Sequence, residues 1–404
     1  NFELEKAQQY AEKAFELRDR VSEHERFYIS EKYENYISGD VNKTIEVLQA
    51  WAKTYPNDYI PHTNLSVNYS FIGRNEDALT EALEAARLDP NNATAAGNVI
   101  ESFIRLNRFD EAKQTLAQLQ ARYPESRPAH FYGFAQAFFS GDSAAMDREL
   151  QWARGKPFEP DFLGNLSAAN AYSGQLRKSE DYVNRAVEML RSQDRKENES
   201  QLKINLAVAQ GLFGRCDQAK TNASAGLALS RGRFSIGFAS LAFAICNEVR
   251  QAQLLIDEGL RLYPKNTAVV SVDIPNTKAQ LELNRNNAPQ AIEILDSSRR
   301  YDLGLFSGFW NNYLRGMAYL QQRSGNEAIA EFQTILDHRG VDVFSPLFPL
   351  AHLGLARAAA LAGDTAKSRT AYQNFFAVWK EADADLPILI QAKKEYEHLS
   401  ARSE

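Results

Sequence analysis

The chain contains 404 residues, of which 44% are hydrophobic and 24% are charged, and its formal net charge at pH 7 is −6. This mild acidic balance argues against a nucleic-acid-binding protein, which would need a clustered basic face. No apolar run approaches the roughly 20 residues of a membrane-spanning helix and no signal peptide is visible, so we expect no direct membrane insertion by this chain.

The first predicted element is a helix over residues 3–18. Within it, Ala7, Ala11 and Ala14 form a stripe of small side chains, which is typical of the second helix of a closely crossing pair. We therefore interpret residues 1–22 as the second helix of a repeat whose first helix lies upstream. Residues 23–386 are predicted to form a solenoid of helical pairs.

A proline-containing phrase recurs at a fixed period in the first third of the chain. Pro56, Pro90 and Pro124 stand 34 residues apart. Each would end a second helix, because proline lacks an N–H and clashes with the preceding turn. A period of this length is typical of stacked helix–turn–helix units. The sequence therefore predicts an all-α solenoid of about ten helical pairs.

A Gly or Asn is predicted to end the first helix of each pair, because both residues tolerate the left-handed backbone conformation. The predicted breaks are Gly39, Gly73, Asn107, Gly141, Gly174, Gly214, Asn247, Asn284, Gly325 and Gly363. The spacing lengthens to 40 residues between Gly174 and Gly214. We attribute the extra length to the charged tract 191–199, interpreted as a solvated helix end and loop.

Residues 387–404 are predicted to form a capping helix, which would cover the last apolar surface of the solenoid and present a charged side to water. Its expected inner face carries Ile388, Ala392 and Tyr396, and its expected outer face carries Lys393, Lys394, Glu395 and Glu397.

The segment 59–90 resembles a tetratricopeptide repeat. The residues that carry the resemblance are Leu65, Ser66, Tyr69, Ala78, Ala85 and Pro90, which follow the spacing of that family. Weaker matches extend the resemblance over nearly the whole chain. It implies a right-handed superhelical solenoid of about ten tetratricopeptide-like repeats, whose first helices line a concave groove that holds a protein or an extended peptide.

A narrower resemblance concerns the C-terminal tetratricopeptide regions of certain bacterial multidomain serine/threonine kinases. The phrases that carry it include 336–340, 361–366 and 386–389. The resemblance implies a kinase domain upstream, often followed by a membrane-spanning helix that would place these repeats outside the cytoplasm. The chain itself has no glycine-rich phosphate loop, no His-Arg-Asp and no Asp-Phe-Gly, so we predict no kinase activity for it.

Four asparagines are candidate ligands for a peptide backbone. Asn64, Asn98, Asn165 and Asn205 occupy equivalent places in four predicted first helices, each directly before an apolar residue. A side-chain amide both donates and accepts, so a row of them could hold an extended peptide without reading its sequence. The alternative is that asparagine at this place bonds within the scaffold.

Cys216 and Cys246 stand beside two neighbouring predicted breaks, so stacking should bring their thiols close together. One alternative is a disulfide, which needs Cα atoms within about 7 Å and would indicate an oxidising compartment. The other is a pair of buried small apolar residues. The aromatic group Phe306, Phe309, Trp310 and Tyr313 is likewise open between a pocket wall and core packing.

No catalytic constellation is found. The six histidines show no metal-like spacing, so we predict a non-enzymatic chain with no cofactor and no metal. The predicted function is a scaffold for protein or peptide binding, and the kinase resemblance implies the interaction or sensory region of a larger bacterial signalling protein. The alternatives are a solenoid that self-assembles through its aromatic surfaces and a kinase regulatory domain that senses a small ligand.

Overall fold

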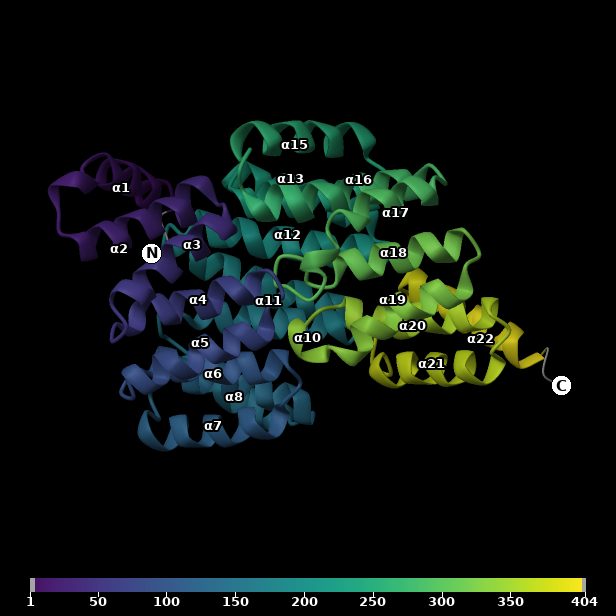
Figure 1. Ribbon diagram of the computed structural model, residues 1–404. Helices are drawn as coiled ribbons and strands as arrows, with labels where there is room; N and C mark the ends of the chain where they lie inside the picture. Colours follow the sequence, from purple (N-terminus) through teal and green to yellow (C-terminus); the bar gives the residue numbers. More distant parts are fainter. Residues whose placement is uncertain (1–3, 402–404) are drawn as a thin grey trace. The chain divides into compact units, whose positions relative to one another are not determined.

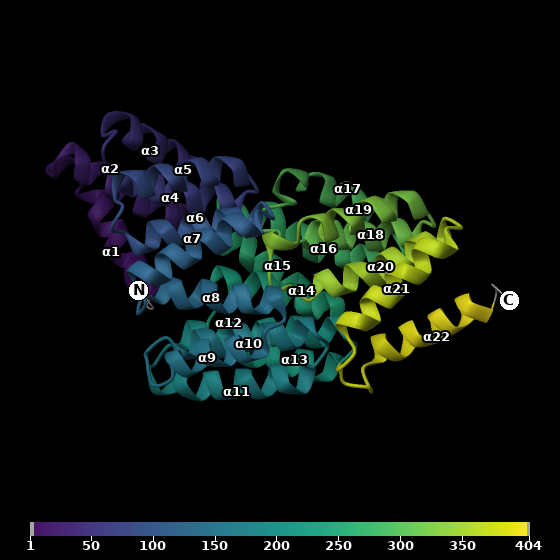
Figure 2. The ribbon, with the colours of Figure 1, turned by 90° about the horizontal axis from the view of Figure 1, so that it is seen from below.

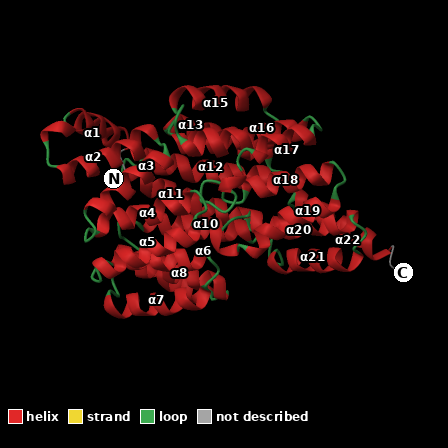
Figure 3. Cartoon of the chain, in the orientation of Figure 1, coloured by secondary structure: helices red, strands yellow, loops and turns green. Residues whose placement is uncertain are grey.

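The structure, a computed structural model, describes residues 4–401. Over this range every regular element is helical and no strand occurs (Figure 3). Helices α2 to α21 form ten consecutive pairs, followed by α22. The prediction of an all-α solenoid of about ten helical pairs is therefore confirmed. In the same range, no helix combines the length and the apolar character needed to cross a membrane.

The chain divides into two compact units, and each is described by itself. Unit 1 comprises the residues up to Lys156 together with the short later segments Tyr263–Val270 and Leu303–Phe306, and unit 2 comprises the remainder. Within each unit, every helix packs against the next one along the chain. In unit 1 the first helices α4, α6 and α8 also pack in succession.

Unit 1 contains nine α-helices (Figure 1). They are α1 (Leu4–Glu16), α2 (Glu23–Tyr33), α3 (Val41–Thr54), α4 (Tyr59–Phe71), α5 (Asn75–Leu88), α6 (Ala93–Arg105), α7 (Phe109–Arg122), α8 (Arg127–Ser140) and α9 (Ser143–Ala153). Helix α1 packs against α2 and against the short helical turn Glu34–Ser38.

Unit 2 contains the remaining thirteen α-helices. They are α10 (Glu159–Tyr172), α11 (Leu176–Ser192), α12 (Lys196–Leu212), α13 (Cys216–Leu229), α14 (Arg233–Ile245), α15 (Val249–Leu262), α16 (Ile274–Asn284), α17 (Ala288–Asp296), α18 (Trp310–Gln321), α19 (Gly325–Asp337), α20 (Leu347–Leu361), α21 (Thr365–Val378) and α22 (Pro387–Ala401). The first helices α12, α14, α16, α18 and α20 pack in succession (Figure 2).

Left-handed residues end the first helices, as the sequence predicts for eight of the ten breaks. Those eight are Gly39, Gly73, Asn107, Gly141, Gly174, Gly214, Asn247 and Gly363, all with positive φ. The other two predictions are wrong by two residues. Helix α16 includes Asn284, so the left-handed residue is Asn286 (φ 57°), and the next break falls at Arg323 (φ 61°).

Gly325 is required for a reason other than the predicted left-handed helix end. It is the first residue of α19, and a Cβ at this position would lie 2.9 Å from the backbone N of Ala362 and 3.0 Å from the backbone O of Ala358. The residue must therefore be glycine because another backbone approaches it, not because it needs a left-handed conformation.

The charged tract 191–199 is not fully solvated, contrary to the prediction. Arg195 and Glu199 are buried, and Glu199 accepts from Arg191 at 2.9 Å. The longer spacing between Gly174 and Gly214 arises because α11 and α12 each have 17 residues.

Two later segments of unit 1 dock on its first two breaks. At Gly39, the backbone N of Thr267 donates to the Gly39 carbonyl at 3.0 Å, and the Thr267 hydroxyl accepts from the backbone N of Val41 at 3.1 Å. At Gly73, the backbone N of Leu305 donates to the carbonyl of Ser70 at 3.1 Å. Each segment thus satisfies backbone groups that the end of a helix leaves unpaired.

The connector between α21 and α22 closes unit 2 on itself. Asp383 donates its backbone N–H to the Gly174 carbonyl at 3.0 Å, and Pro387 packs against Gly214, where a Cβ would lie 3.0 Å from the proline. Arg215 forms an ion pair with Asp385. The turns that follow α10 and α12 therefore contact the far end of the same unit.

Helix α22 is the capping helix, and Leu389 and Ala392 are its buried residues. One residue of its expected outer face lies elsewhere. Glu395 is half-buried, accepts from Arg357 of α20 at 2.9 Å and accepts from the Tyr372 hydroxyl of α21 at 3.0 Å. A carboxylate can be buried here because a guanidinium and a phenol satisfy it.

Candidate functional site

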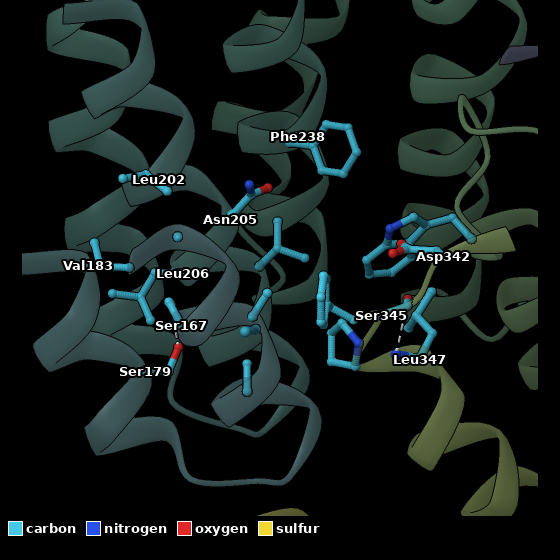
Figure 4. A pocket seen from close by; sticks show the side chains of 18 residues that line it. Ser167, Ser179, Val183, Leu202, Asn205, Leu206, Phe238, Asp342, Ser345 and Leu347 are labelled. Atoms are coloured by element: carbon cyan, nitrogen blue, oxygen red, sulfur yellow. Dashed lines mark hydrogen bonds between the residues drawn. The ribbon is translucent and has the colours of Figure 1, made fainter. Parts of the chain in front are cut away.

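The inner face of unit 2 contains a cavity of about 250 Å³, which we call the inner cavity (Figure 4). Helices α10, α11, α12 and α14 form one side of it, and Trp310, the loop 342–346 and Leu347 at the start of α20 form the other. Figure 4 shows Asn205 and Phe238 on one side and Asp342, Ser345 and Leu347 on the opposite side.

Small and aliphatic residues form the α10–α12 wall. Gly164 and Ala168 come from α10, and Leu202, Leu206 and Ala209 come from α12. The buried hydroxyls Ser167 and Ser179 also line the cavity, but their oxygens lie 2.8 Å apart and are hydrogen-bonded to each other. This wall is therefore mainly apolar in character.

The polar groups of the inner cavity are few and come from separate elements. Asn205 on α12 is exposed, so its amide is available to a ligand. Asp342 supplies a carboxylate from the loop. Ser345 holds that loop, because its hydroxyl accepts from the backbone N of Leu347 at 3.4 Å. An apolar cleft with a few convergent polar groups is the usual form of a ligand site.

The side of the cavity that carries Trp310 rests on a buried ionic cluster. Arg315 is fully buried and donates to Glu331 at 2.8 Å, and it also pairs with Asp302. Burial raises the pKa of Asp302, while the hydrogen bond from Arg315 opposes that shift. The cluster joins α18 to α19 and to Asp302 in the segment before α18. Loss of one partner would leave a buried charge unpaired.

Phe309, the residue before α18, has a left-handed backbone with φ 74° and a fully buried side chain. This conformation is unfavourable for a residue with a Cβ. It turns the chain into α18 and sets the position of Trp310, which is 7% exposed. Of the aromatic group left open by the sequence, Phe309 is core and Trp310 is a cavity wall.

A second, larger hollow of about 540 Å³ lies on the inner face between α12, α14, α16, α18, α20 and Ile388 of α22. Amide side chains join the first helices here. Asn284 donates to the carbonyl of Ala244 at 2.7 Å, and Gln321 donates to the carbonyl of Leu283 at 3.1 Å. We did not predict these scaffold bonds. Their sequence signal is an amide two residues before the left-handed residue, as at Asn284 and Gln321.

The four predicted asparagines lie in two separate units. Asn64 and Asn98 belong to unit 1, and Asn165 and Asn205 belong to unit 2. Asn98 donates to the carbonyl of Thr63 at 3.4 Å, which is a bond within the scaffold. The amide nitrogen of Asn165 is buried without a hydrogen-bond partner. Asn205 is the one of the four that lines the inner cavity.

Cys216 and Cys246 form a disulfide, and their Cα atoms lie 5.4 Å apart. Cys216 is the first residue of α13 and Cys246 follows the last residue of α14. The disulfide adjoins the wall of the larger hollow, because a Cβ on Gly211 would lie 3.5 Å from the sulfur of Cys246.

Titratable residues elsewhere form structural pairs. His62 contacts Glu81 at 2.6 Å and His130 contacts Glu149 at 2.5 Å, which are matching positions two repeats apart in unit 1. Burial lowers the pKa of His352 to about 4. Among the residues that the structure describes, no three His, Cys, Asp or Glu side chains gather as a metal site would require.

Family models of the tetratricopeptide repeat match residues 72–132 and 313–375. These two segments therefore match tetratricopeptide repeats, which generally mediate protein–protein interaction. The match confirms the resemblance to tetratricopeptide repeats in these two segments.

Three solved structures overlap this chain along most of its length. Yeast Tom70 is 12% identical, with 97% of this chain and 96% of that chain covered and a TM-score of 0.38. The Cut9–Hcn1 hetero-tetramer of APC/C is 11% identical, with 95% of this chain and 66% of that chain covered and a TM-score of 0.47. The human IFIT1 dimer with PPP-AAAA is 13% identical, with 90% of this chain and 86% of that chain covered and a TM-score of 0.46. No curated protein matches the sequence significantly.

Proposed function

We propose that this chain is a non-catalytic scaffold that binds a short segment of a partner protein on the inner face of unit 2. The observation that carries the proposal is the inner cavity, in which the exposed amide of Asn205 lies on the mainly apolar α10–α12 wall, across the cavity from Asp342.

The size of the inner cavity favours one or two side chains of a ligand. Its volume of about 250 Å³ equals about eight water molecules at roughly 30 Å³ each. Asn205 could accept from one backbone N–H of the segment and donate to one carbonyl, which is how an amide holds an extended chain. Because the buried Arg315 cluster and the closure of unit 2 fix the walls, little ordering entropy would be lost on binding.

Asn64 and Asn98 extend the proposal to unit 1. The amide nitrogen of Asn98 is engaged by Thr63, but its side-chain oxygen could still accept from a peptide N–H. We propose these two residues as a separate, secondary peptide contact within unit 1, in which Asn98 contributes less than Asn205 does in unit 2 because its amide nitrogen already bonds the scaffold.

We further propose that the scaffold is the docking or sensory region of a bacterial signalling protein. This rests on the sequence resemblance at 336–340 and 361–366 to regions that follow kinase domains. The disulfide Cys216–Cys246 supports an oxidising compartment for it. The test is to read the gene upstream of residue 1. A kinase domain followed by a membrane-spanning helix is expected, and a start codon close to residue 1 with no other domain would contradict the proposal.

The binding proposal is tested with an array of short peptides and the purified chain. For a peptide that binds, Asn205→Ala should weaken binding about three- to tenfold, the effect of losing one or two hydrogen bonds. Asn184→Ala is the matched control, because Asn184 is exposed on α11 and does not line the inner cavity. Equal affinity of both variants would contradict binding at the inner cavity.

A further inference from the structure

The larger hollow, which the proposed function does not use, has the size of a small-molecule site. Its volume is about 540 Å³, and sites for small molecules usually measure about 300–1,000 Å³. All of the residues that line it belong to unit 2. Apolar side chains from five helices form most of its wall, namely Leu212, Ile245, Leu283, Met317, Leu320 and Ile388.

Tyr313 of α18 brings an unused hydroxyl to this hollow. The residue lines the hollow and is 9% exposed, and among the described residues no group pairs with its hydroxyl. Burial raises the pKa of this phenol, while the charge of Arg357 opposes the shift, so the hydroxyl keeps its proton at neutral pH. A nearly buried polar group without a partner is costly, and a ligand that accepts its hydrogen bond removes that cost.

Arg357 of α20 adds N–H donors to the hollow without adding net charge. Its Nε and Nη2 donate to the carboxylate of Glu395 at 2.9 and 3.2 Å, so the guanidinium charge is balanced within the protein. A guanidinium has five N–H groups, of which these two bonds use two. Among the described residues that line the hollow, Arg357 is the one charged side chain.

The walls of the hollow are held by contacts within unit 2. A disulfide adjoins the hollow at Gly211, and the side-chain amides of Asn284 and Gln321 join α16 to α14 and α18 to α16. The ion pair between Arg357 and Glu395 joins α20 to α22. Because the site is formed in advance, little ordering entropy is lost when a ligand binds.

We propose that the larger hollow binds a small uncharged molecule that consists of an aliphatic chain and a carbonyl group, such as an acyl amide. The hydroxyl of Tyr313 donates to the carbonyl oxygen, and the chain lies against the apolar wall at Met317 and Leu320. This gives the chain a small-molecule site in addition to its scaffold role. The inference is independent of peptide binding at the inner cavity, because the two cavities share no described lining residue.

The balanced charge of the hollow favours an uncharged head group. A carboxylate would be attracted by Arg357 but repelled by Glu395, and burial would remove its hydration. An ammonium group would be repelled by Arg357 and would lose its hydration as well. A carbonyl oxygen accepts from Tyr313 without the burial of a charge.

The volume accommodates a chain of about eight carbons. It corresponds to about 18 water molecules at roughly 30 Å³ each. A chain of this length also gains from the apolar wall, since each methylene that leaves water adds to the affinity.

The first experiment compares three eight-carbon ligands on the wild-type chain by titration calorimetry. The probes are octanamide, octanoate and octylammonium at about pH 7, which share the aliphatic chain and differ in the head group. We expect octanamide to bind about tenfold more tightly than either charged probe, because it alone enters without burying a charge. Tighter binding of a charged probe, equal binding of all three or no binding of octanamide would overturn the assignment.

Tyr313→Phe tests the head-group contact. The variant keeps the ring and removes the hydroxyl, so octanamide should bind about three- to tenfold more weakly, which is the effect of losing one hydrogen bond. Thermal unfolding without ligand should show no loss of stability, because the hydroxyl bonds no other described residue. Tyr319→Phe is the matched control, since Tyr319 belongs to the same helix and does not line the hollow. Equal affinity of the two variants for octanamide would contradict the assignment.

Met317→Gln tests the contact with the aliphatic chain. Met317 is half-buried in the wall of the hollow, and glutamine keeps the length of the side chain but makes it polar. Octanamide should bind this variant about three- to tenfold more weakly than the wild type. If octanamide binds the wild type, Tyr313→Phe and Met317→Gln with the same affinity, its site lies elsewhere and the proposal is wrong.

Discussion

The indole N–H of Trp379 donates to the backbone carbonyl of Tyr172 at 3.0 Å, although the two residues are 207 positions apart. Trp379 is 2% exposed, and its ring also packs edge-on against Phe213 at 4.9 Å. One side chain therefore joins the last pair of unit 2 to its first two pairs.

Replacing Trp379 with Phe should remove this hydrogen bond while retaining an aromatic ring. We expect a loss of about 1–3 kcal/mol in the free energy of unfolding, because the buried carbonyl of Tyr172 is left without its donor. Denaturant unfolding measures the loss, and hydrogen exchange should show faster exchange in α10. The control is Trp152→Phe, since Trp152 bonds Glu125 at an exposed place. An equal loss in both variants would contradict the importance of the closure.

Gly174 and Gly363 offer a matched pair for the same closure. Both have positive φ, 71° and 84°, so alanine at either position should cost about 1–2 kcal/mol in backbone strain. At Gly174 the new Cβ would also lie 2.6 Å from Ala382, whereas at Gly363 nothing lies within 4 Å. Thermal unfolding should therefore show a clearly larger loss for Gly174→Ala than for Gly363→Ala. Similar losses of stability in the two variants would show that the segment between α21 and α22 can move away from a Cβ at position 174 without a cost in free energy.

Asp273 should make the stability depend on pH. Burial raises its pKa to about 7, against a smaller opposing effect of Arg233. A carboxyl whose pKa is higher in the folded state binds its proton more tightly there, so its contribution is fully present below about pH 4 and is lost as pH rises to about 7. Asp273→Asn should therefore raise the free energy of unfolding at pH 8 by about 1–3 kcal/mol relative to the wild type.

The same variant should have little effect at pH 4, where the Asp273 carboxyl is protonated in the folded protein and is therefore neutral, as asparagine is. Urea unfolding of both proteins between pH 4 and pH 8 checks the difference. If Asp273→Asn changes the free energy of unfolding by the same amount at all pH values, the cause is instead a packing effect beside Gly237, which lies against the Asp273 carboxylate.

Reduction of the disulfide Cys216–Cys246 should destabilise unit 2. The two cysteines are 30 residues apart, and a cross-link over a loop of this length stabilises by about 3–4 kcal/mol through the unfolded state. Thermal unfolding with and without reductant measures the effect. Cys216→Ser should be as unstable as the reduced protein and insensitive to reductant. Alkylation of both thiols in the native, unreduced protein would contradict the prediction.

The local features of the fold could be predicted because they depend on neighbouring residues. Gly39 and Gly73 end helices through their own backbone freedom, and Ala78 is fully buried, as expected where two helices cross. Arg323 could not be predicted as a break, because arginine has no preference for a left-handed backbone and tertiary packing imposes it.

The site was less predictable than the helices. Asn205 was found by its place in the repeat and lines the inner cavity, but its three counterparts do not. Asp342 and Trp310 come from segments that deviate from the repeat period, so no periodic signal marks them. The lengths of the connecting segments determine which first helices Asp342 and Trp310 face. The repeat pattern in the sequence does not predict these contacts.

The bond between Thr267 and Gly39 has a consequence for synthesis. The backbone N–H of Val41 finds its acceptor on Thr267, 226 residues later in the chain, and Asn75 donates to the carbonyl of Leu303 at 3.2 Å over 228 residues. A ribosome must therefore translate past residue 303 before the first and second pairs of helices can make both of these bonds. The earliest repeats to emerge are among the last to be completed, so a chaperone that recognises nascent chains would find these two turns open for most of translation.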